Sequence, residues 1–300
     1  MKLIRRFASC LLTPALFCST AALARTAAPL PDAEPAMWVV KDKDTTIYLF
    51  GTFHALDGKR DWFNDEVRDA FNASSEVVLE IITPENPADM RPALLRHALT
   101  AANTPTLSSK LSADGRTRLA AILAKNKMPT GALDRFRPFF ASVTLASLQF
   151  GSMGMGAEQG AEAVIRRAMK GGDKQLGAVE TVDEQFALLN ALPEAEQLRI
   201  LESTLKEEGS MATEITSMLD AWHRGDAKAV AKAIQQSDKD SPSLYKLMFT
   251  DRNARWAKWV DRRLDRPGTV FLAVGAGHLA GDRSLVTLLK KDGHRISRVQ

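Results

Sequence analysis

The chain has 300 residues, of which 45% are hydrophobic, 40 are Lys or Arg and 36 are Asp or Glu. This balance excludes a disordered chain, a collagen-like repeat and a highly charged tail protein, because enough apolar mass is present to form a core. The length fits one large domain or two small ones.

The first 24 residues have the pattern of a secretory signal peptide. A positive head is followed by an uncharged stretch, residues 7–24, which ends in the small-x-small triplet Ala22-Leu23-Ala24 of a cleavage site. Polar residues dilute its apolar part below the roughly 20 strongly apolar residues of a membrane-spanning helix, which favours cleavage over the alternative of an uncleaved anchor. We therefore expect export to the periplasm or the cell exterior, by the general or the twin-arginine route. The mature chain should begin near Arg25 and should not span a membrane.

Removal of this segment changes the charge and the thiol content of the chain. The segment carries three positive charges and no negative one, so the net charge falls from +4 to +1. That balance does not favour a nucleic-acid partner. Both cysteines, Cys10 and Cys18, lie in the segment, so any metal site of the mature chain must use His and carboxylate ligands.

The chain after the signal begins with strand patterns. Residues 25–36 are rich in Ala and Pro and predict a flexible leader. Two apolar, β-branched runs, Met37–Val40 and Thr45–Gly51, are separated by four charged residues and predict a β-hairpin. Asp61–Ala73 has one apolar face and predicts a helix. Glu76–Ile82 predicts a strand that is buried on both faces.

The centre of the chain has mostly helical periodicity, interrupted by a glycine-rich loop at Gly151–Gly156. Strands are expected between the helices at Gln175–Glu180, Thr269–Gly275 and His294–Val299, and Thr181 begins a helix with a Thr-x-x-Glu capping box. The expected helices are Ala88–Thr100, Ser109–Asn126, Arg135–Phe150, Ala157–Lys170, Pro193–Gly209, Met211–Arg224, Asp226–Gln236, Ser241–Leu264 and Leu279–Lys291.

The strand patterns cluster at both ends of the chain, with one in the middle, and no linker of disordered composition divides them. We predict an α/β fold, with residues 37–300 forming a single domain. Its central mixed sheet is formed from N- and C-terminal segments, and large helical insertions cover it. Two independent domains are the disfavoured alternative, because either end alone has too few strands.

One motif occurs twice in the same context. Two buried-strand patterns each end in Gly-x-x-His, from Gly51 to His54 and from Gly275 to His278. Ligands of open α/β sheets bind beyond the carboxyl ends of the strands, and glycine lets the backbone turn sharply there and approach a ligand. Gly277 adds a further glycine turn. We therefore expect the two histidines to converge on one site.

A carboxylate interrupts the apolar strand pattern at Glu80, where it is costly unless it is paired or metal-bound. Two imidazoles and a carboxylate form a common catalytic metal set with positions open for water, whose pKa the ion lowers. A metal-free alternative uses Glu80 as a general base and a histidine as acid or oxyanion donor. Each residue alone also has a structural explanation, and the repeated strand-end context is what favours a shared site.

The sequence around these residues resembles the TraB/GumN family, which is related to the Tiki membrane metalloproteases and to pheromone-shutdown proteins. The resemblance extends over residues 37–300 and is most specific at the two Gly-x-x-His segments. The matching segments are Ile47–His54, Leu79-Glu80, Gly177–Thr181 with Glu184-Gln185, Asp251–Asn253 with Trp256, Val274–Gly281 and Leu288–His294.

The resemblance implies a central sheet with a catalytic site built from His54, Glu80 and His278. Tiki relatives are peptidases that depend on Mn²⁺ or Co²⁺, so the resemblance also implies that these three residues are metal ligands. Three further residues lie at polar family positions and are interpreted as substrate-binding, with a helix dipole contact, a cap or a salt bridge as the alternative. These are Arg252, Glu158 and Glu180.

We therefore predict an exported, metal-dependent hydrolase that cleaves amide bonds in a peptide or small amide substrate. Two alternatives remain open. In the first, the cleft sequesters a peptide or a metal without turnover, as the pheromone-shutdown relatives suggest. In the second, Glu and His hydrolyse an ester without metal. The sequence carries no signal for an oligomeric state.

Overall fold

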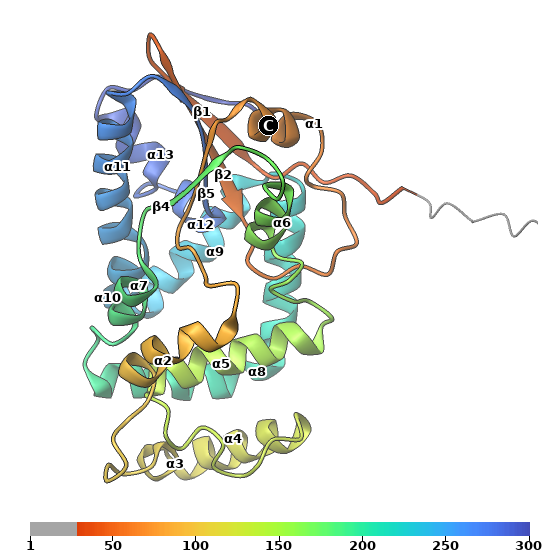
Figure 1. Ribbon diagram of the computed structural model, residues 1–300. Coiled ribbons are helices and arrows are strands. Elements are labelled where there is room, and N and C mark those ends of the chain that lie inside the picture. Colours follow the sequence, from red (N-terminus) through yellow and green to blue (C-terminus); the bar gives the residue numbers. More distant parts are fainter. Residues whose placement is uncertain (1–28) are drawn as a thin grey trace, which may run out of the picture. The chain divides into compact units, whose positions relative to one another are not determined.

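The structure is a computed structural model that describes residues 29–300 (Figure 1). The predicted signal peptide and the first residues of the predicted leader lie outside the described residues. Residues 31–300 form one compact unit. No helix within residues 29–300 is both long and apolar enough to cross a membrane.

The later part of the predicted leader packs against the domain. The side chain of Ala33 is buried, and its backbone NH donates to the carbonyl of Asp61 over 2.9 Å. Asp32 forms an isolated bridge with the same residue. Residues 31–36 therefore differ from the expected flexible segment, because their backbone groups are bonded to Asp61, His223 and Gly51.

The central sheet has six strands in the order β4-β3-β5-β2-β1-β6. Strand β5 pairs in parallel with both β2 and β3, and β3 pairs in parallel with β4, whereas β1 is antiparallel to β2 and to β6. The two ends of the chain thus supply the centre of the sheet, which confirms the predicted mixed α/β fold. The strands are β1 Met37–Lys41, β2 Thr45–Thr52, β3 Glu76–Leu79, β4 Gln175–Ala178, β5 Gly268–Gly275 and β6 Ile296–Arg298.

Helices cover both faces of the sheet because the central strands are apolar on both sides. Phe50 and Phe271 face one core, and their neighbours Leu49 and Leu272 face the other. Figure 1 shows α1 and α6 on one side of the sheet and α11 and α13 on the opposite side. These helices are α1 Asp65–Ala73, α6 Ala161–Ala168, α11 Asp251–Leu264 and α13 Leu285–Lys291.

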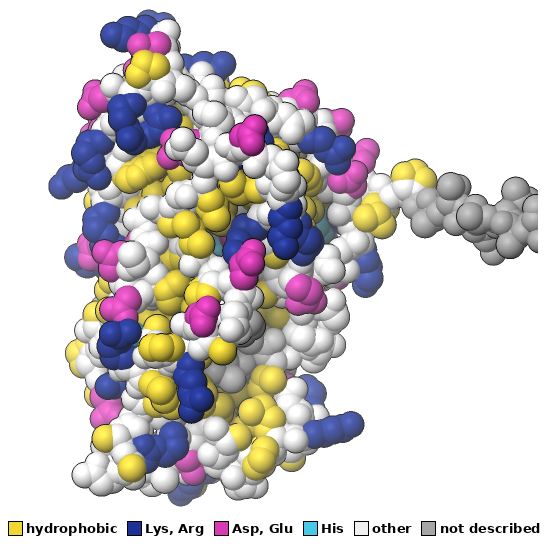
Figure 2. Space-filling view, viewed as in Figure 1, with side chains coloured by type: hydrophobic (Ala, Val, Ile, Leu, Met, Phe, Trp, Pro, Cys, Tyr) yellow, Lys and Arg dark blue, Asp and Glu magenta, His cyan; other side chains and the backbone are white. Residues whose placement is uncertain are grey.

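The remaining helices form the insertions, with a separate core between α4, α5 and α8 that includes Leu123, Leu145 and Leu201. Figure 2 shows hydrophobic side chains gathered over the part of the surface that carries α2 and α5. The remaining helical segments are η1 Pro87–Met90, α2 Arg91–His97, α3 Leu107–Lys110, α4 Ala113–Lys125, α5 Pro138–Ser152, α7 Val182–Leu189, α8 Glu194–His223, α9 Ala227–Asp240, α10 Pro242–Tyr245, the π-helical turn η2 Lys246–Thr250 and α12 Ala276–Leu279.

Several predicted boundaries were wrong, while the predicted capping box at Thr181 is confirmed. Helix α8 continues through Gly209, where two helices were expected, because one interior glycine costs only about 1 kcal/mol in a helix. The predicted helix Ser241–Leu264 is divided by the π-helical turn η2. Strand β3 stops at Leu79, so Glu80 lies just beyond the strand and at the edge of the sheet.

Candidate active site

A cavity of about 400 Å³ lies at the carboxyl ends of the parallel strands β2, β3 and β5. His54, Glu80 and His278 all line it, together with Arg252. The structure thus brings the two Gly-x-x-His segments to one place, as their strand-end positions require. The catalytic and metal-binding roles given to these residues remain predictions.

A buried ion cluster forms the wall at β3. Arg252 is 2% exposed, and its Nη2 donates to Glu80 Oε2 over 2.7 Å and to Glu180 Oε2 over 2.8 Å. Its Nε donates to both Glu180 oxygens over 3.0 Å. The Glu80 Oε1 atom accepts the backbone NH of Gly275 over 2.7 Å. Glu180 lies behind Arg252 and outside the cavity lining, so it orients the guanidinium.

Glu80 is held in its charged form. Burial raises the pKa of this carboxyl, but the neighbouring groups His278, Arg252 and His54, with the Gly275 NH, lower it to about 2. Burial lowers the pKa of His278 to about 3, so that imidazole is neutral near pH 7. Near neutral pH, Glu80 is therefore not attracted to a charged His278, and Arg252 is the dominant cationic partner of Glu80.

His278, which follows the end of β5, is held by hydrogen bonds to both ring nitrogens and by contacts with aromatic rings. The Nε2 of His278 accepts an N–H from Arg252 over 3.1 Å, and its Nδ1 donates to Asn253 Oδ1 over 2.7 Å. The ring packs on Trp256 at 4.3 Å and on Phe249 at 5.0 Å between ring centroids. Its side chain is 5% exposed. These contacts select the tautomer with the proton on Nδ1.

The first strand-end histidine is open to solvent and has an acidic partner that the sequence interpretation missed. The side chain of His54 is 66% exposed, and its Nδ1 lies 2.7 Å from Glu162 Oε1. The same oxygen accepts the hydroxyl of Thr52 over 2.5 Å. Attraction to Glu162, opposed by partial desolvation, raises the pKa of His54 to about 9. Burial raises the pKa of Glu162, but His54 and Thr52 outweigh it and keep the pKa below its usual value.

The position of Glu162 follows from where α6 begins. The helix was predicted to start at Ala157, which put Glu158 in its first turn, but it starts at Ala161 and has Glu162 there instead. A Cβ on Gly160 would stand only 2.0 Å from the carbonyl oxygen of His54, so only glycine permits this close approach. Two glycines ahead of the helix, at positions 156 and 160, were the available sequence signal for a later start.

Glu158 does not reach the cavity. Its side chain is exposed and lines a separate surface depression with Arg166 and Arg167. Of the three residues interpreted as substrate-binding, Arg252 lines the cavity, Glu180 supports Arg252, and Glu158 lies elsewhere.

The glycines at the strand ends make room for the site. A Cβ on Gly275 would lie 3.1 Å from Glu80 Oε1 and 3.3 Å from His54 Nε2, so both polar atoms face the same small space. A Cβ on Gly51 would lie 3.1 Å from the Cα of Ala276, which explains the close contact between the two strand ends.

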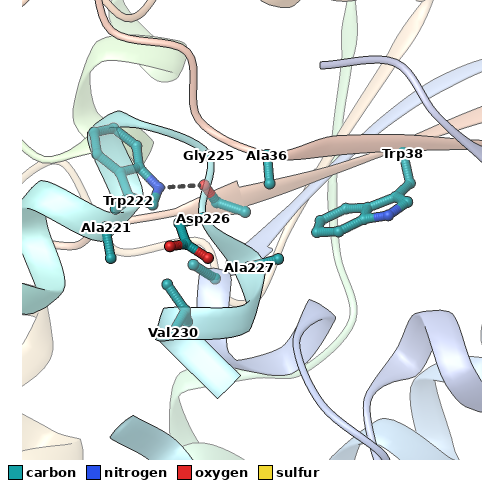
Figure 3. A pocket seen from close by; sticks show the side chains of 10 residues that line it. Ala36, Trp38, Ala221, Trp222, Gly225, Asp226, Ala227 and Val230 are labelled. Atoms are coloured by element: carbon teal, nitrogen blue, oxygen red, sulfur yellow. Dashed lines mark hydrogen bonds between the residues drawn. The ribbon is translucent and has the colours of Figure 1, made fainter. Parts of the chain in front are cut away.

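Trp222 of α8 anchors this end of the sheet. Its indole NH donates to the carbonyl of Gly51 over 2.7 Å. Figure 3 shows this bond beside a small second pocket, which Trp38, Ala221 and Val230 also line. Trp222 contributes to both cavities, so it forms part of the wall between them.

The three predicted metal ligands do not form a metal site in this arrangement. His54 and Glu80 fit ligand roles, since an outer carboxylate on Nδ1 is typical of a ligating histidine. The lone pair of His278 Nε2, however, is taken up by the Arg252 guanidinium. Across residues 29–300, no group of three or more His, Cys, Asp or Glu side chains is arranged to hold an ion.

The sequence matches known proteins over nearly all of the described chain. The TraB/PrgY/gumN family model matches residues 36–298. An uncharacterized protein of Treponema pallidum is 23% identical, over 94% of this chain and 88% of its own length. Metalloprotease TIKI1 of Danio rerio is 25% identical, over 91% of this chain and 64% of its own length.

Other relatives match more briefly. The uncharacterized protein YbaP of Escherichia coli is 29% identical over 50% of this chain and 54% of its own length. This chain therefore spans less than two thirds of TIKI1 and of YbaP. No solved structure gives a significant match.

Proposed function

Because the chain belongs to the TraB/PrgY/gumN family and gathers His54, Glu80, Arg252 and His278 in one cavity, we propose that it is a hydrolase of amide bonds, with peptides as substrates. The observation that carries the proposal is the opposition of two charged groups across one space. His54, paired with Glu162, is cationic near pH 7, and Glu80, paired with Arg252, is anionic. The relatives named metalloproteases support the same reaction class.

Amide hydrolysis needs a group that orients and deprotonates water, and a donor for the carbonyl oxygen or the leaving nitrogen. In the proposed roles, Glu80 accepts a hydrogen bond from the attacking water and receives its proton as the new C–O bond forms. The Nε2–H of His54 donates to the substrate oxygen, and His54 then gives this proton to the leaving amine as the C–N bond breaks. The proton that Glu80 took from water returns to Nε2 of His54, which faces the same space. Glu162 holds His54 through Nδ1, so the Nε2 edge faces the cavity.

Arg252 and His278 act behind these two groups. Arg252 keeps Glu80 ionised and fixes its Oε2, which leaves Oε1 turned toward Gly275 and His54. The neutral His278 accepts one guanidinium N–H and so fixes the plane of Arg252. No step is assigned to a metal ion, because His278 is not free to ligate one in this arrangement.

The test uses the full chain purified without a histidine tag. A peptide library is incubated with the protein in three arms: as purified, with EDTA and with added Mn²⁺. We expect discrete cleavage products by mass spectrometry, and their loss with His54→Ala. Cleavage only with Mn²⁺ would refute the metal-free roles above. Saturable peptide binding with no product in any arm would replace the hydrolase with the sequestering alternative.

We further propose that the chain is exported and cleaved near Arg25, which the charge pattern of the first 24 residues supports. Mass spectrometry of the protein from its native host should find a mature N-terminus close to this residue. An intact Met1 in the cytosolic fraction would overturn this proposal.

A further inference from the structure

The cavity has an extensive apolar wall that the proposed chemistry does not use. The polar groups come from the strand ends, α7 and α11, whereas the apolar side chains come from the end of β2 and from α5, α8, α9 and η2. The main apolar residues are Phe53, Phe150, Met218, Ile234, Met248 and Phe249. A cavity with a mostly apolar lining and a few polar groups is typical of sites that bind small organic ligands.

Most of these apolar side chains are only partly buried, unlike those of the sheet core. Five of the six keep an intermediate exposure, although Phe50 and Phe271 of the adjoining sheet are completely buried. Phe53 contacts Phe150 edge-on at 6.3 Å and Trp222 at 6.0 Å between centroids, so the wall is continuous with the core and well supported. An apolar group placed against this wall would remove its remaining surface from water, which is favourable.

Gly277 joins the apolar wall to the site. A Cβ at this position would stand 2.4 Å from Ile234 Cδ1 and 2.9 Å from Phe249 Cε1, so glycine lets both side chains lie against the second strand end. Phe249 also contacts the ring of His278. The glycine turn predicted to admit a ligand thus serves instead to bring apolar side chains next to the polar groups.

We propose that this wall, defined by the six residues above, is a subsite for a large apolar side chain, such as Leu, Met or Phe, next to the bond that is cleaved. The occupant follows from the continuity of the wall with His54 and Glu80 and from the volume of about 400 Å³, which suits a side chain with its adjoining peptide groups. The assignment of a scissile bond rests on the proposed function, but apolar binding does not.

The test therefore measures binding and hydrolysis separately. Blocked tripeptides with Leu, Phe or Asp at the central position are titrated against the full chain by ligand-detected NMR. The Leu and Phe peptides should bind at least about tenfold more tightly than the Asp peptide, as expected when an apolar pocket receives an apolar side chain. Equal affinity for all three would overturn the subsite.

A matched pair of variants then locates the binding. Ile234→Ala enlarges the space beside the wall, so it should favour the larger Phe side chain and change the ratio of Phe to Leu affinity by about threefold to tenfold. Ile122→Ala is the control, because it removes the same atoms from a residue of the α4 core, away from the cavity. The two side chains are similarly buried, with exposures of 9% for Ile122 and 8% for Ile234. The control should leave the ratio unchanged. An equal shift in both variants would overturn the location.

A second variant tests the subsite if Ile234→Ala does not fold. Met218 is only partly buried, so Met218→Glu should be tolerated and should weaken binding of the Leu peptide about tenfold. Unchanged Leu binding in this variant would count against the subsite. Apolar preference in binding without any cleavage would sustain the subsite and refute the hydrolase. Cleavage without an apolar preference in binding would sustain the hydrolase and refute the subsite.

Discussion

The two Gly-x-x-His strand ends have the same sequence pattern and opposite environments. His54 follows β2 at the rim of the cavity, where its side chain is 66% exposed and bonded to an acid. His278 follows β5, enters the short helix α12 and is 5% exposed between Trp256, Phe249 and Arg252. Attraction to Glu162 raises the pKa of the first to about 9, and burial lowers that of the second to about 3.

This difference teaches that a repeated motif does not imply a repeated role. The strand end places each histidine near the ligand space, but the elements packed on it decide its charge. Helix α6 brings a carboxylate to His54, whereas α11 brings a guanidinium to His278. The pair is therefore asymmetric, with one reactive and one supporting imidazole.

The largest expected effect separates these two roles. His54→Ala should reduce peptide hydrolysis by about 10²–10⁴-fold, the usual contribution of a general acid or base. Its free energy of unfolding near pH 7 should fall by no more than about 1 kcal/mol, because His54 and Glu162 form a largely exposed ion pair. His278→Ala should lose both activity and stability, because it opens a cavity and leaves Arg252 and Asn253 without a partner. Equal loss of stability in the two variants, measured in urea, would break the comparison.

The next effect concerns the cation between the two carboxylates. Arg252→Leu leaves Glu80 buried without its bonded cation and Glu180 with only the half-exposed Arg255, and should cost about 3–5 kcal/mol of unfolding free energy. Arg255→Leu is the control, since Arg255 bonds the same Glu180 with a side chain that is 51% exposed. The control should cost less than about 1 kcal/mol. Similar losses in both variants would show that burial of the cluster is not what makes it important.

The third effect tests the origin of the charge on His54. Glu162→Gln removes the attraction and should lower the pKa of His54 from about 9 toward its ordinary value of 6.5, as followed by NMR titration of the imidazole. Glu158→Gln removes an exposed acid that lies outside the cavity and should leave that pKa unchanged. A shift of the same size in the second variant would assign the effect to general surface charge.

The smallest effect is a difference in pH dependence. The unfolded chain protonates His278 near 6.5 and the folded chain only near 3, so this residue makes stability rise with pH between those values. His54, with a raised pKa, stabilises fully below 6.5, and its contribution is lost as pH rises through about 9. Urea unfolding at a series of pH values should lose most of its slope between about pH 4.5 and 6.5 in His278→Gln, above the range in which Glu80 titrates, and its alkaline-side slope in His54→Gln. Unchanged slopes in these two ranges would contradict the charge states of the histidines.

The fold was largely predictable because its strands are unambiguous. The apolar runs of β2 and β5 and their glycine ends indicate buried parallel strands, and the positions of His54, Glu80 and His278 at one sheet edge follow from them. Arg252 was found through family resemblance, since an arginine on a helix has no intrinsic signal. Glu162 was missed because the start of α6 depends on a tertiary contact, the approach of Gly160 to the His54 carbonyl.

Boundaries failed where local preference and packing disagree. Gly209 suggested a break in α8, but the packing of Leu201, Leu205 and Leu219 on either side of it holds one continuous helix. The order of residues 31–36 was likewise hidden, because the backbone bond between Ala33 and Asp61 has no sequence pattern of its own.

The pairing of β2 with β5 determines when this protein can fold. Thr45 pairs with Gly268 and Thr52 with Gly275, so β2 has no parallel neighbour until the chain has been synthesised beyond residue 275. Until then its residues Ile47, Leu49 and Phe50, which end up fully buried, have one edge of their strand unpaired. Such long-range pairing slows folding and exposes apolar surface on the growing chain. A chain truncated before β5 should therefore bind chaperones and aggregate, whereas loss of the short edge strand β6 should be tolerated far better.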